Sequence, residues 1–151
     1  MREIVSLSYE KTKRYYEFGD FLRDLFKFKV QKISINAGFT CPNRDGSKGW
    51  GGCTYCNNQT FSPEYCHTEK SVTEQLEEGV RFFSRKYPDM RYLAYFQAYT
   101  NTYDRLDSLI LKYEEALAYP GVEGLIVALV RTVCRKVYWI ILRSFPSENS
   151  S

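Results

Sequence analysis

Three short β-prone segments, at 30–36, 92–99 and 122–127, alternate along this chain with segments whose apolar residues recur at helical spacing. In the first segment, VQKISIN, Ile33 and Ile35 alternate with polar residues, as in a strand with one buried face. Strands that alternate with helices of this length form βαβ units, and such units build a parallel sheet. The sequence therefore predicts an α/β fold with about three parallel strands.

The first two helices are indicated by apolar spacing and by capping residues. The segment FGDFLRDLFKF, at 18–28, places its phenylalanines and leucines on one helical face. Ser71 and Glu74 fit a capping box, in which each residue caps the other. A helix is therefore predicted to start at Ser71 and to stop before Pro88.

The third helix is predicted between the second and third strands. Either Asp104 or Asp107 is expected to be its N-cap, and Pro120 follows its end. In parallel α/β folds, functional residues lie on the loops that follow the carboxyl ends of the strands. The glycine-rich loop after the first strand is therefore the first place to look for a site.

That loop holds three of the five cysteines. Eleven residues separate Cys41 from Cys53, and two separate Cys53 from Cys56. The close pair lets two thiolates converge on one metal centre, and the flexible glycine-rich gap lets Cys41 reach a third position. Three thiolates suit either a zinc ion, which needs a fourth ligand, or a 4Fe-4S cluster, which can leave one iron open.

Cys66 and His67 keep the zinc alternative open. Either residue could complete a Cys₄ or Cys₃His site with Cys41, Cys53 and Cys56, giving a non-catalytic zinc-binding module. The competing interpretations are an incidental loop thiol and a solvated loop histidine. Spacing alone does not choose between zinc and an iron–sulfur cluster.

The N-terminal segment predicts a cytoplasmic protein without a membrane partner. Charged residues interrupt MREIVSLSYEKTKRYY, which has no apolar core of signal-peptide length. No stretch approaches the ~20 apolar residues that a membrane span needs. In the cytoplasm thiols stay reduced, so clustered cysteines more often bind metal than form disulfides.

The segments NAGFTCPNRDG and GGCTYCNNQTFSP resemble the cluster loop of radical S-adenosylmethionine (SAM) enzymes. Those enzymes often have CxxxCxxC with an aromatic residue before the last cysteine, and Tyr55 holds that place here. The wider first gap, with SVTEQLEEG and YLAYFQAYTNTY, resembles a bacterial branch related to the catalytic subunit of Elongator. The resemblance covers roughly residues 13–127.

The resemblance implies a division of the chain into three parts. Residues 1–29 would be an N-terminal helical extension. Residues 30–127 would be the N-terminal half of a (β/α) partial TIM barrel, with the cluster loop at 37–67. Residues 128–151 would not form a domain.

The resemblance also implies a chemistry. Cys41, Cys53 and Cys56 would bind three irons of a 4Fe-4S cluster, and the fourth iron would chelate the amino and carboxylate groups of SAM. Reductive cleavage of SAM would give a 5′-deoxyadenosyl radical that abstracts hydrogen from an unknown substrate. A reducing electron-donor protein is implied as a partner, and kinship with a tRNA-modifying subunit allows RNA as the substrate.

Four residues are implied as SAM contacts. Tyr55 would flank the adenine, and Gln97, Tyr99 and Asn101 would supply polar contacts at the end of the second strand. The stretch QAYTNTY replaces the Gly-Gly-Glu-like stretch that is commoner in the superfamily.

The last 24 residues differ in character from the rest. Reading the gene one base earlier from Val127 onward permits GTRPDCVPESLLDYLEEL, which resembles the family in a GTRPDC-like stretch and a following helix. We therefore expect residues 128–151 to be translated out of frame and the chain as written to lack turnover. The alternative is a basic tail that binds nucleic acid, since the excess positive charge lies there, on Arg131, Arg135, Lys136 and Arg143.

Overall fold

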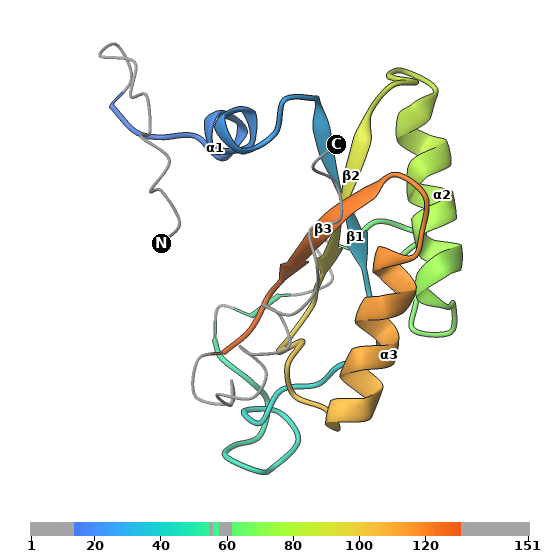
Figure 1. Ribbon diagram of the computed structural model, residues 1–151. Helices are drawn as coiled ribbons and strands as arrows, with labels where there is room; N and C mark the ends of the chain where they lie inside the picture. Colours follow the sequence, from blue (N-terminus) through green and yellow to red (C-terminus); the bar gives the residue numbers. More distant parts are fainter. Residues whose placement is uncertain (1–13, 55, 58–61, 131–151) are drawn as a thin grey trace, which may run out of the picture.

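The computed structural model describes residues 14–54, 56–57 and 62–130 (Figure 1). Tyr55, Cys134 and the expected out-of-frame tail beyond residue 130 lie outside these described residues. Helices and strands follow in the predicted order: α1 (Phe18–Leu25), β1 (Val30–Ile35), α2 (Val72–Ser84), β2 (Arg91–Phe96), α3 (Leu106–Leu117) and β3 (Val122–Val127).

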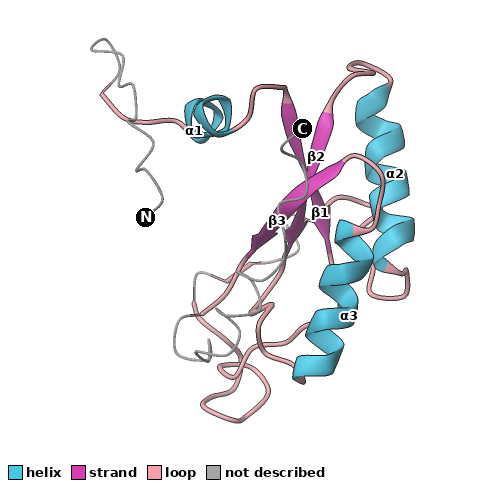
Figure 2. Cartoon of the chain, viewed as in Figure 1, coloured by secondary structure: helices cyan, strands magenta, loops and turns pink. Residues whose placement is uncertain are grey.

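The three strands form one parallel sheet in the order β1-β2-β3. Ile35 of β1 pairs with Phe96 of β2, and Phe96 pairs in turn with Val127 of β3. The register of β2 and β3 shifts between Tyr92 and Leu93. Helices α2 and α3 lie side by side on one face of the sheet (Figures 1 and 2). The predicted α/β fold with three parallel strands is confirmed.

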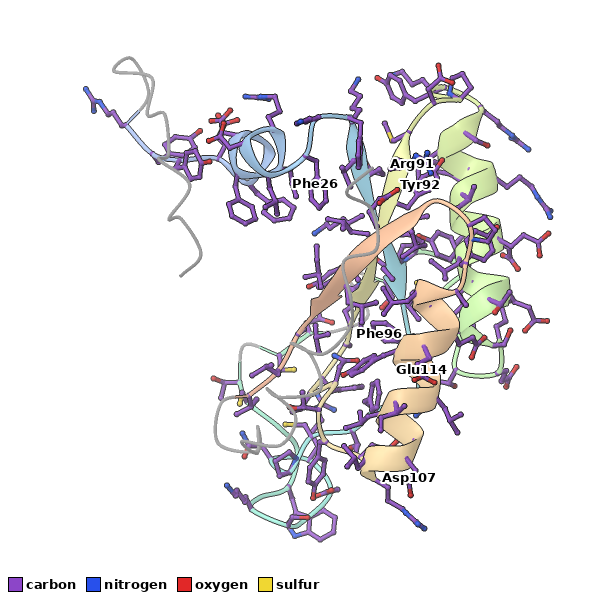
Figure 3. All side chains as sticks on the ribbon, in the orientation of Figure 1. Phe26, Arg91, Tyr92, Phe96, Asp107 and Glu114 are labelled. Atoms are coloured by element: carbon purple, nitrogen blue, oxygen red, sulfur yellow. The ribbon has the colours of Figure 1, made fainter. Side chains whose placement is uncertain are left out.

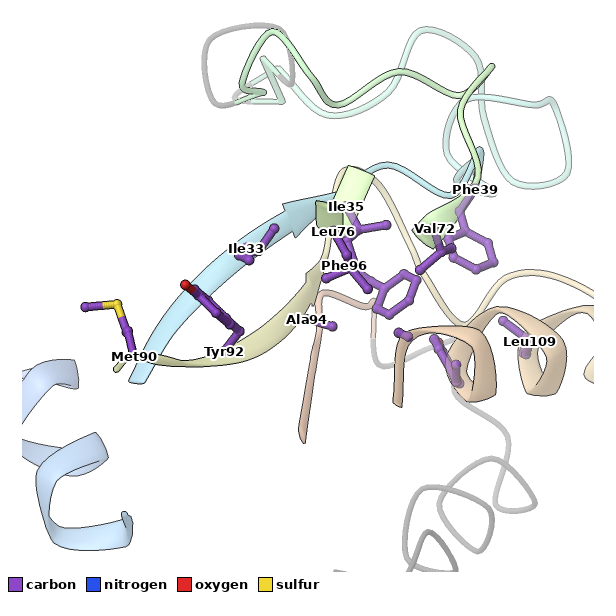
Figure 4. Packing of buried hydrophobic residues seen from close by; sticks show 12 residues of the cluster. Ile33, Ile35, Phe39, Val72, Leu76, Met90, Tyr92, Ala94, Phe96 and Leu109 are labelled. Atoms are coloured by element: carbon purple, nitrogen blue, oxygen red, sulfur yellow. The ribbon is translucent and has the colours of Figure 1, made fainter. Parts of the chain in front are cut away.

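The hydrophobic core lies between the sheet and these two helices (Figure 4). Ile33, Ile35, Ala94 and Phe96 are completely buried on this face. Phe96 points from β2 toward α3, where its ring meets Tyr113 edge to face at 5.0 Å (Figure 3). Each large side chain buried here contributes roughly 1.5–3 kcal/mol, so the helix-covered face supplies most of the stabilisation.

Helix α2 starts as predicted. The Ser71 hydroxyl accepts a hydrogen bond from the Glu74 amide at 3.1 Å, and the Glu74 carboxylate accepts one from the Ser71 amide at 2.7 Å. These bonds stabilise the charged carboxylate and hold the pKa of Glu74 below its ordinary value. Further along the helix, Gly79 lies against Ile33 of β1, where an added Cβ would collide with the isoleucine side chain.

Helix α3 differs from the prediction at its first turn. Its N-cap is Arg105, which makes no side-chain capping bond, so the expectation that Asp104 or Asp107 caps the helix is wrong. Asp104 lies one residue before the cap, and its carboxylate accepts hydrogen bonds from Ser108 Oγ at 2.6 Å and Lys112 Nζ at 3.0 Å. Asp104 therefore binds side chains from the first two turns of α3, although it lies outside the helix itself.

Helix α1 and strand β2 are shorter than predicted. Helix α1 ends at Leu25 because Phe26 has extended backbone, and none of its residues is buried. Strand β2 ends at Phe96, after which Tyr99 adopts a left-handed backbone with a φ of 63°. Within the described residues, no helix combines the length and the apolar composition that crossing a bilayer requires.

Candidate functional site

A cavity of about 460 Å³ lies at the carboxyl ends of the strands, on the face of the sheet opposite α2 and α3. Its walls come from β1, the cysteine loop (residues 41–56), the segment after β2 and the residues that follow β3. Cys41, Cys53 and Cys56 all line it. The structure thus brings the three predicted ligands together at the predicted edge of the sheet.

Main-chain hydrogen bonds close the cysteine loop on itself. The Arg44 amide donates to the Cys41 carbonyl at 2.8 Å, the Lys48 amide to the Pro42 carbonyl at 2.8 Å, and the Gly52 amide to the Asn43 carbonyl at 2.9 Å. The long gap between Cys41 and Cys53 is therefore shaped by its own backbone.

The thiols of Cys41 and Cys53 receive hydrogen bonds from polar side chains. Thr100 Oγ1 lies 3.5 Å from Cys41 Sγ, and Asn43 Nδ2 lies 3.6 Å from Cys53 Sγ. None of the four described cysteines forms a disulfide. Donors directed at sulfur orient thiolate ligands and tune the metal that they bind. The donor set fits a three-thiolate ligand group.

The three thiols share the cavity but do not converge on a single point. Within residues 14–54, 56–57 and 62–130, no three Cys, His, Asp or Glu side chains meet closely enough to hold one metal ion. Zinc–sulfur bonds of about 2.3 Å would require such convergence.

Cys66 lies apart from this cavity. Its side chain is buried, and its thiol donates to the Ser34 carbonyl at 3.0 Å. Burial raises the pKa of Cys66 to about 12, so this group stays protonated at neutral pH. His67 is exposed. The structure therefore gives neither residue a place beside the three thiols, and the zinc-binding module stays a prediction.

The predicted SAM contacts divide into three groups. Gln97 and Tyr99 line the cavity, as expected for residues that contact a ligand there. Asn101 is completely buried and does not line it; its amide donates to the carbonyls of Ala98 at 3.1 Å and Ala128 at 2.9 Å. Asn101 thus ties the loop after β2 to the end of β3. Tyr55 lies outside the described residues.

Other residues that were not predicted to be functional also line the cavity, among them Lys32, Ser34, Arg44 and Thr100. Lys32 and Ser34 occupy the strand positions that alternate with the buried isoleucines, so the period of two in β1 could have identified them. Arg44 lies in a turn of the cysteine loop, and no sequence signal shows that its side chain would enter the cavity.

A buried glutamine fixes the start of the loop. Gln75 of α2 accepts a hydrogen bond from the Asn36 amide at 2.8 Å and donates to the Asn36 carbonyl at 3.0 Å. The same amide donates to the Lys70 carbonyl at 3.1 Å. Because buried backbone groups must be satisfied, this side chain holds the chain in place where it leaves β1.

The chain is similar to curated proteins that are about three times as long as the matched region. Protein YhcC of Escherichia coli K12 is 41% identical over 110 residues, which are 73% of this chain and 34% of that protein. The uncharacterized protein YtqA of Bacillus subtilis is 36% identical over 116 residues, which are 77% of this chain and 36% of that protein.

A more distant relative is an uncharacterized protein of Methanocaldococcus jannaschii, 26% identical over 125 residues, or 82% of this chain. The chain therefore spans about a third of the length of the curated relatives it matches. No family model matches the sequence, and no solved structure matches it.

Proposed function

We propose that this chain carries the cofactor-binding part of a radical SAM enzyme. In this proposal Cys41, Cys53 and Cys56 bind a 4Fe-4S cluster, and SAM binds beside it in the same cavity. The observation that carries the proposal is the joint placement of these three thiols on one cavity wall, while Cys66 is buried elsewhere.

The arrangement of the sheet supports the proposal. The strands follow one another in sequential order, and α2 and α3 cover the same face. A (β/α) barrel is built in this way, whereas a doubly wound sheet has helices on both faces. We therefore propose that β1, β2 and β3 form the first part of a partial barrel whose inner face carries the cavity.

The residues of this chain would bind and orient the cofactors. Thr100 and Asn43 donate to the ligand sulfurs, which also tunes the reduction potential of iron–sulfur centres. In this proposal Gln97 and Tyr99, which line the cavity, contact SAM. When bound, the cluster would supply the electron that cleaves the sulfonium bond of SAM, with an electron-donor protein as the source.

The proposal is tested by anaerobic reconstitution with iron and sulfide. The wild-type chain is expected to bind about four irons and four sulfides and to become brown. Cys56→Ala is expected to lose most of this iron, because it removes one of three ligands. SAM should change the electron paramagnetic resonance spectrum of the reduced wild-type protein.

Cys66→Ser is the matched control. It also removes a thiol, but Ser can still donate to the Ser34 carbonyl, so iron content should stay unchanged. A colourless protein that holds one zinc and loses it in Cys66→Ser would overturn the proposal. Far-UV circular dichroism on each variant separates loss of iron from loss of fold.

A further inference from the structure

We propose that Arg44 is the residue of this cavity that binds the carboxylate of its ligand. The inference rests on the proposed function, in which that ligand is SAM and the carboxylate belongs to its methionine part. It assigns a role to a side chain for which the sequence indicated no function.

The charges along the cavity wall point to an anionic group. Two cationic side chains, Lys32 and Arg44, line the cavity, and no described Asp or Glu does. Arg44 makes no ion pair with any described residue. The neighbouring Asp45 carboxylate is turned to the Ser47 amide, which donates to it at 2.9 Å. The cavity therefore presents positive charge without a carboxylate of its own.

The guanidinium of Arg44 is held in place on two sides. Its central carbon lies 5.0 Å from the centroid of the Tyr99 ring, a cation–π contact. On another side it lies against Gly52, where an added Cβ would come within 2.6 Å of Arg44 Nε. Arg44 Nη2 also lies 3.4 Å from the Cys56 carbonyl. A fixed guanidinium loses little conformational freedom when it binds a ligand.

One donor of this guanidinium lacks an acceptor. Arg44 Nε is buried, and within the described residues no atom accepts a hydrogen bond from it. A buried donor without a partner is costly, and native sites usually satisfy such groups with a ligand, an ion or water. Guanidinium groups bind carboxylates through two parallel hydrogen bonds, so a ligand carboxylate that reached Nε would satisfy this donor.

Tyr99 has a supporting role in this arrangement. Its left-handed backbone, with a φ of 63°, is uncommon for a residue other than glycine, and such conformations cluster at functional sites. The ring that this conformation presents is the one that lies against Arg44. The Tyr99 ring therefore helps to hold the Arg44 side chain that lines the cavity.

The experiment compares two ligands on reconstituted proteins. SAM and decarboxylated SAM share the adenosine and sulfonium parts, and only SAM has the carboxylate. Arg44→Gln is expected to weaken SAM binding roughly ten- to hundred-fold in equilibrium dialysis, since a hydrogen-bonded charge is lost. Binding of decarboxylated SAM should change less than about three-fold, because it has no carboxylate to lose.

Two further variants test whether the guanidinium geometry of Arg44 and its position in the cavity are both needed for SAM binding. Arg44→Lys keeps the charge but not the two-pronged geometry, so it should recover only part of the affinity. Lys48→Gln removes one positive charge from the same loop at an exposed position outside the cavity, and it should bind SAM as the wild type does.

Each remaining outcome overturns the inference. If Arg44→Gln weakens both ligands equally, or neither, Arg44 does not bind the carboxylate. If Arg44→Gln loses its iron, the guanidinium acts on the thiolates instead. If the wild-type protein binds no cluster or no SAM, the proposed function fails and this inference falls with it, whereas a failure confined to the Arg44 variants leaves the proposed function standing.

Discussion

The two faces of the sheet use the same three strands for different purposes. On the face toward α2 and α3, Ile33, Ile35 and Phe96 are completely buried in apolar contacts. On the opposite face, the alternate positions Lys32 and Tyr95 line the cavity, and the ammonium of Lys32 lies 4.6 Å from the centre of the Tyr95 ring.

This difference separates stability from chemistry within single strands. Because neighbouring residues of a strand point to opposite faces, a substitution changes either the core or the cavity wall, but seldom both. Pairs of substitutions at adjacent or matched positions therefore test whether the two faces are as independent as the structure indicates.

The largest effect is expected from Phe96→Ala. Its ring is completely buried against Tyr113, so its removal leaves a cavity and should lower the free energy of unfolding by about 3–5 kcal/mol. Tyr95→Ala, one residue earlier on the other face, should cost less than about 1 kcal/mol because Tyr95 is only half-buried. Urea unfolding followed by circular dichroism measures both. Equal losses would show that the opposite face is also a structural core.

The next effect concerns two glycines that lie on opposite faces. Gly79→Ala forces a methyl group into Ile33 and should destabilise the fold by about 1–3 kcal/mol. Gly124→Ala places its methyl group 3.4 Å from Leu93, an ordinary contact. That second substitution should be neutral or stabilise by up to about 1 kcal/mol, since alanine restricts the unfolded chain. Thermal unfolding of the two variants gives the comparison, which fails if Gly124→Ala is the more damaging.

Asn101 and Gln97 provide a smaller test at the edge of the cavity. Asn101→Ala removes the amide that binds the carbonyls of Ala98 and Ala128, and it should cost about 1–2 kcal/mol. Gln97→Ala should cost less stability than Asn101→Ala, because Gln97 is only half-buried, and it should weaken SAM binding. Unfolding midpoints and dialysis with SAM are measured on both. A loss of SAM binding in a stably folded Asn101→Ala protein would restore Asn101 as a direct contact.

At neutral pH the smallest effect is that of Cys66, whose contribution to stability changes only in alkaline solution. Burial raises the pKa of its thiol from 9.0 to about 12, so the folded state holds this proton more tightly than the unfolded chain does. Its contribution is fully present below pH 9 and is lost as pH rises toward 12. Relative to Cys66→Ser, the wild type should therefore lose urea resistance above pH 9, and parallel curves would contradict this assignment.

Most of the fold could be predicted from local patterns. The capping box at Ser71 and the alternation around Ile33 act over a few residues, so the sequence shows them directly. The N-cap of α3 could not be predicted in this way, because Asp104 and Asp107 both suit a cap and the structure uses Arg105. Which residue becomes the N-cap depends on the partners of Asp104, whose carboxylate accepts a hydrogen bond from Lys112 two helical turns away.

The candidate site was predicted less completely. The spacing of Cys41, Cys53 and Cys56 identified three residues that share one cavity, since cysteines in one loop stay close after folding. The place of Arg44 in the cavity and the buried position of Asn101 could not be predicted, because both depend on contacts between distant segments. Arg44 meets the ring of Tyr99, and Asn101 meets the backbone after β3, and neither contact leaves a periodic signal in the sequence.

The backbone bonds that close the cysteine loop have a consequence for recognising related chains. The carbonyls of Cys41, Pro42 and Asn43 accept these bonds, and no side chain is needed to make them. Substitutions at exposed loop positions such as Lys48 can therefore accumulate while the thiols keep their places. Searches that require a short, fixed gap between the first two cysteines would pass over such chains, whereas searches by loop shape would retrieve them.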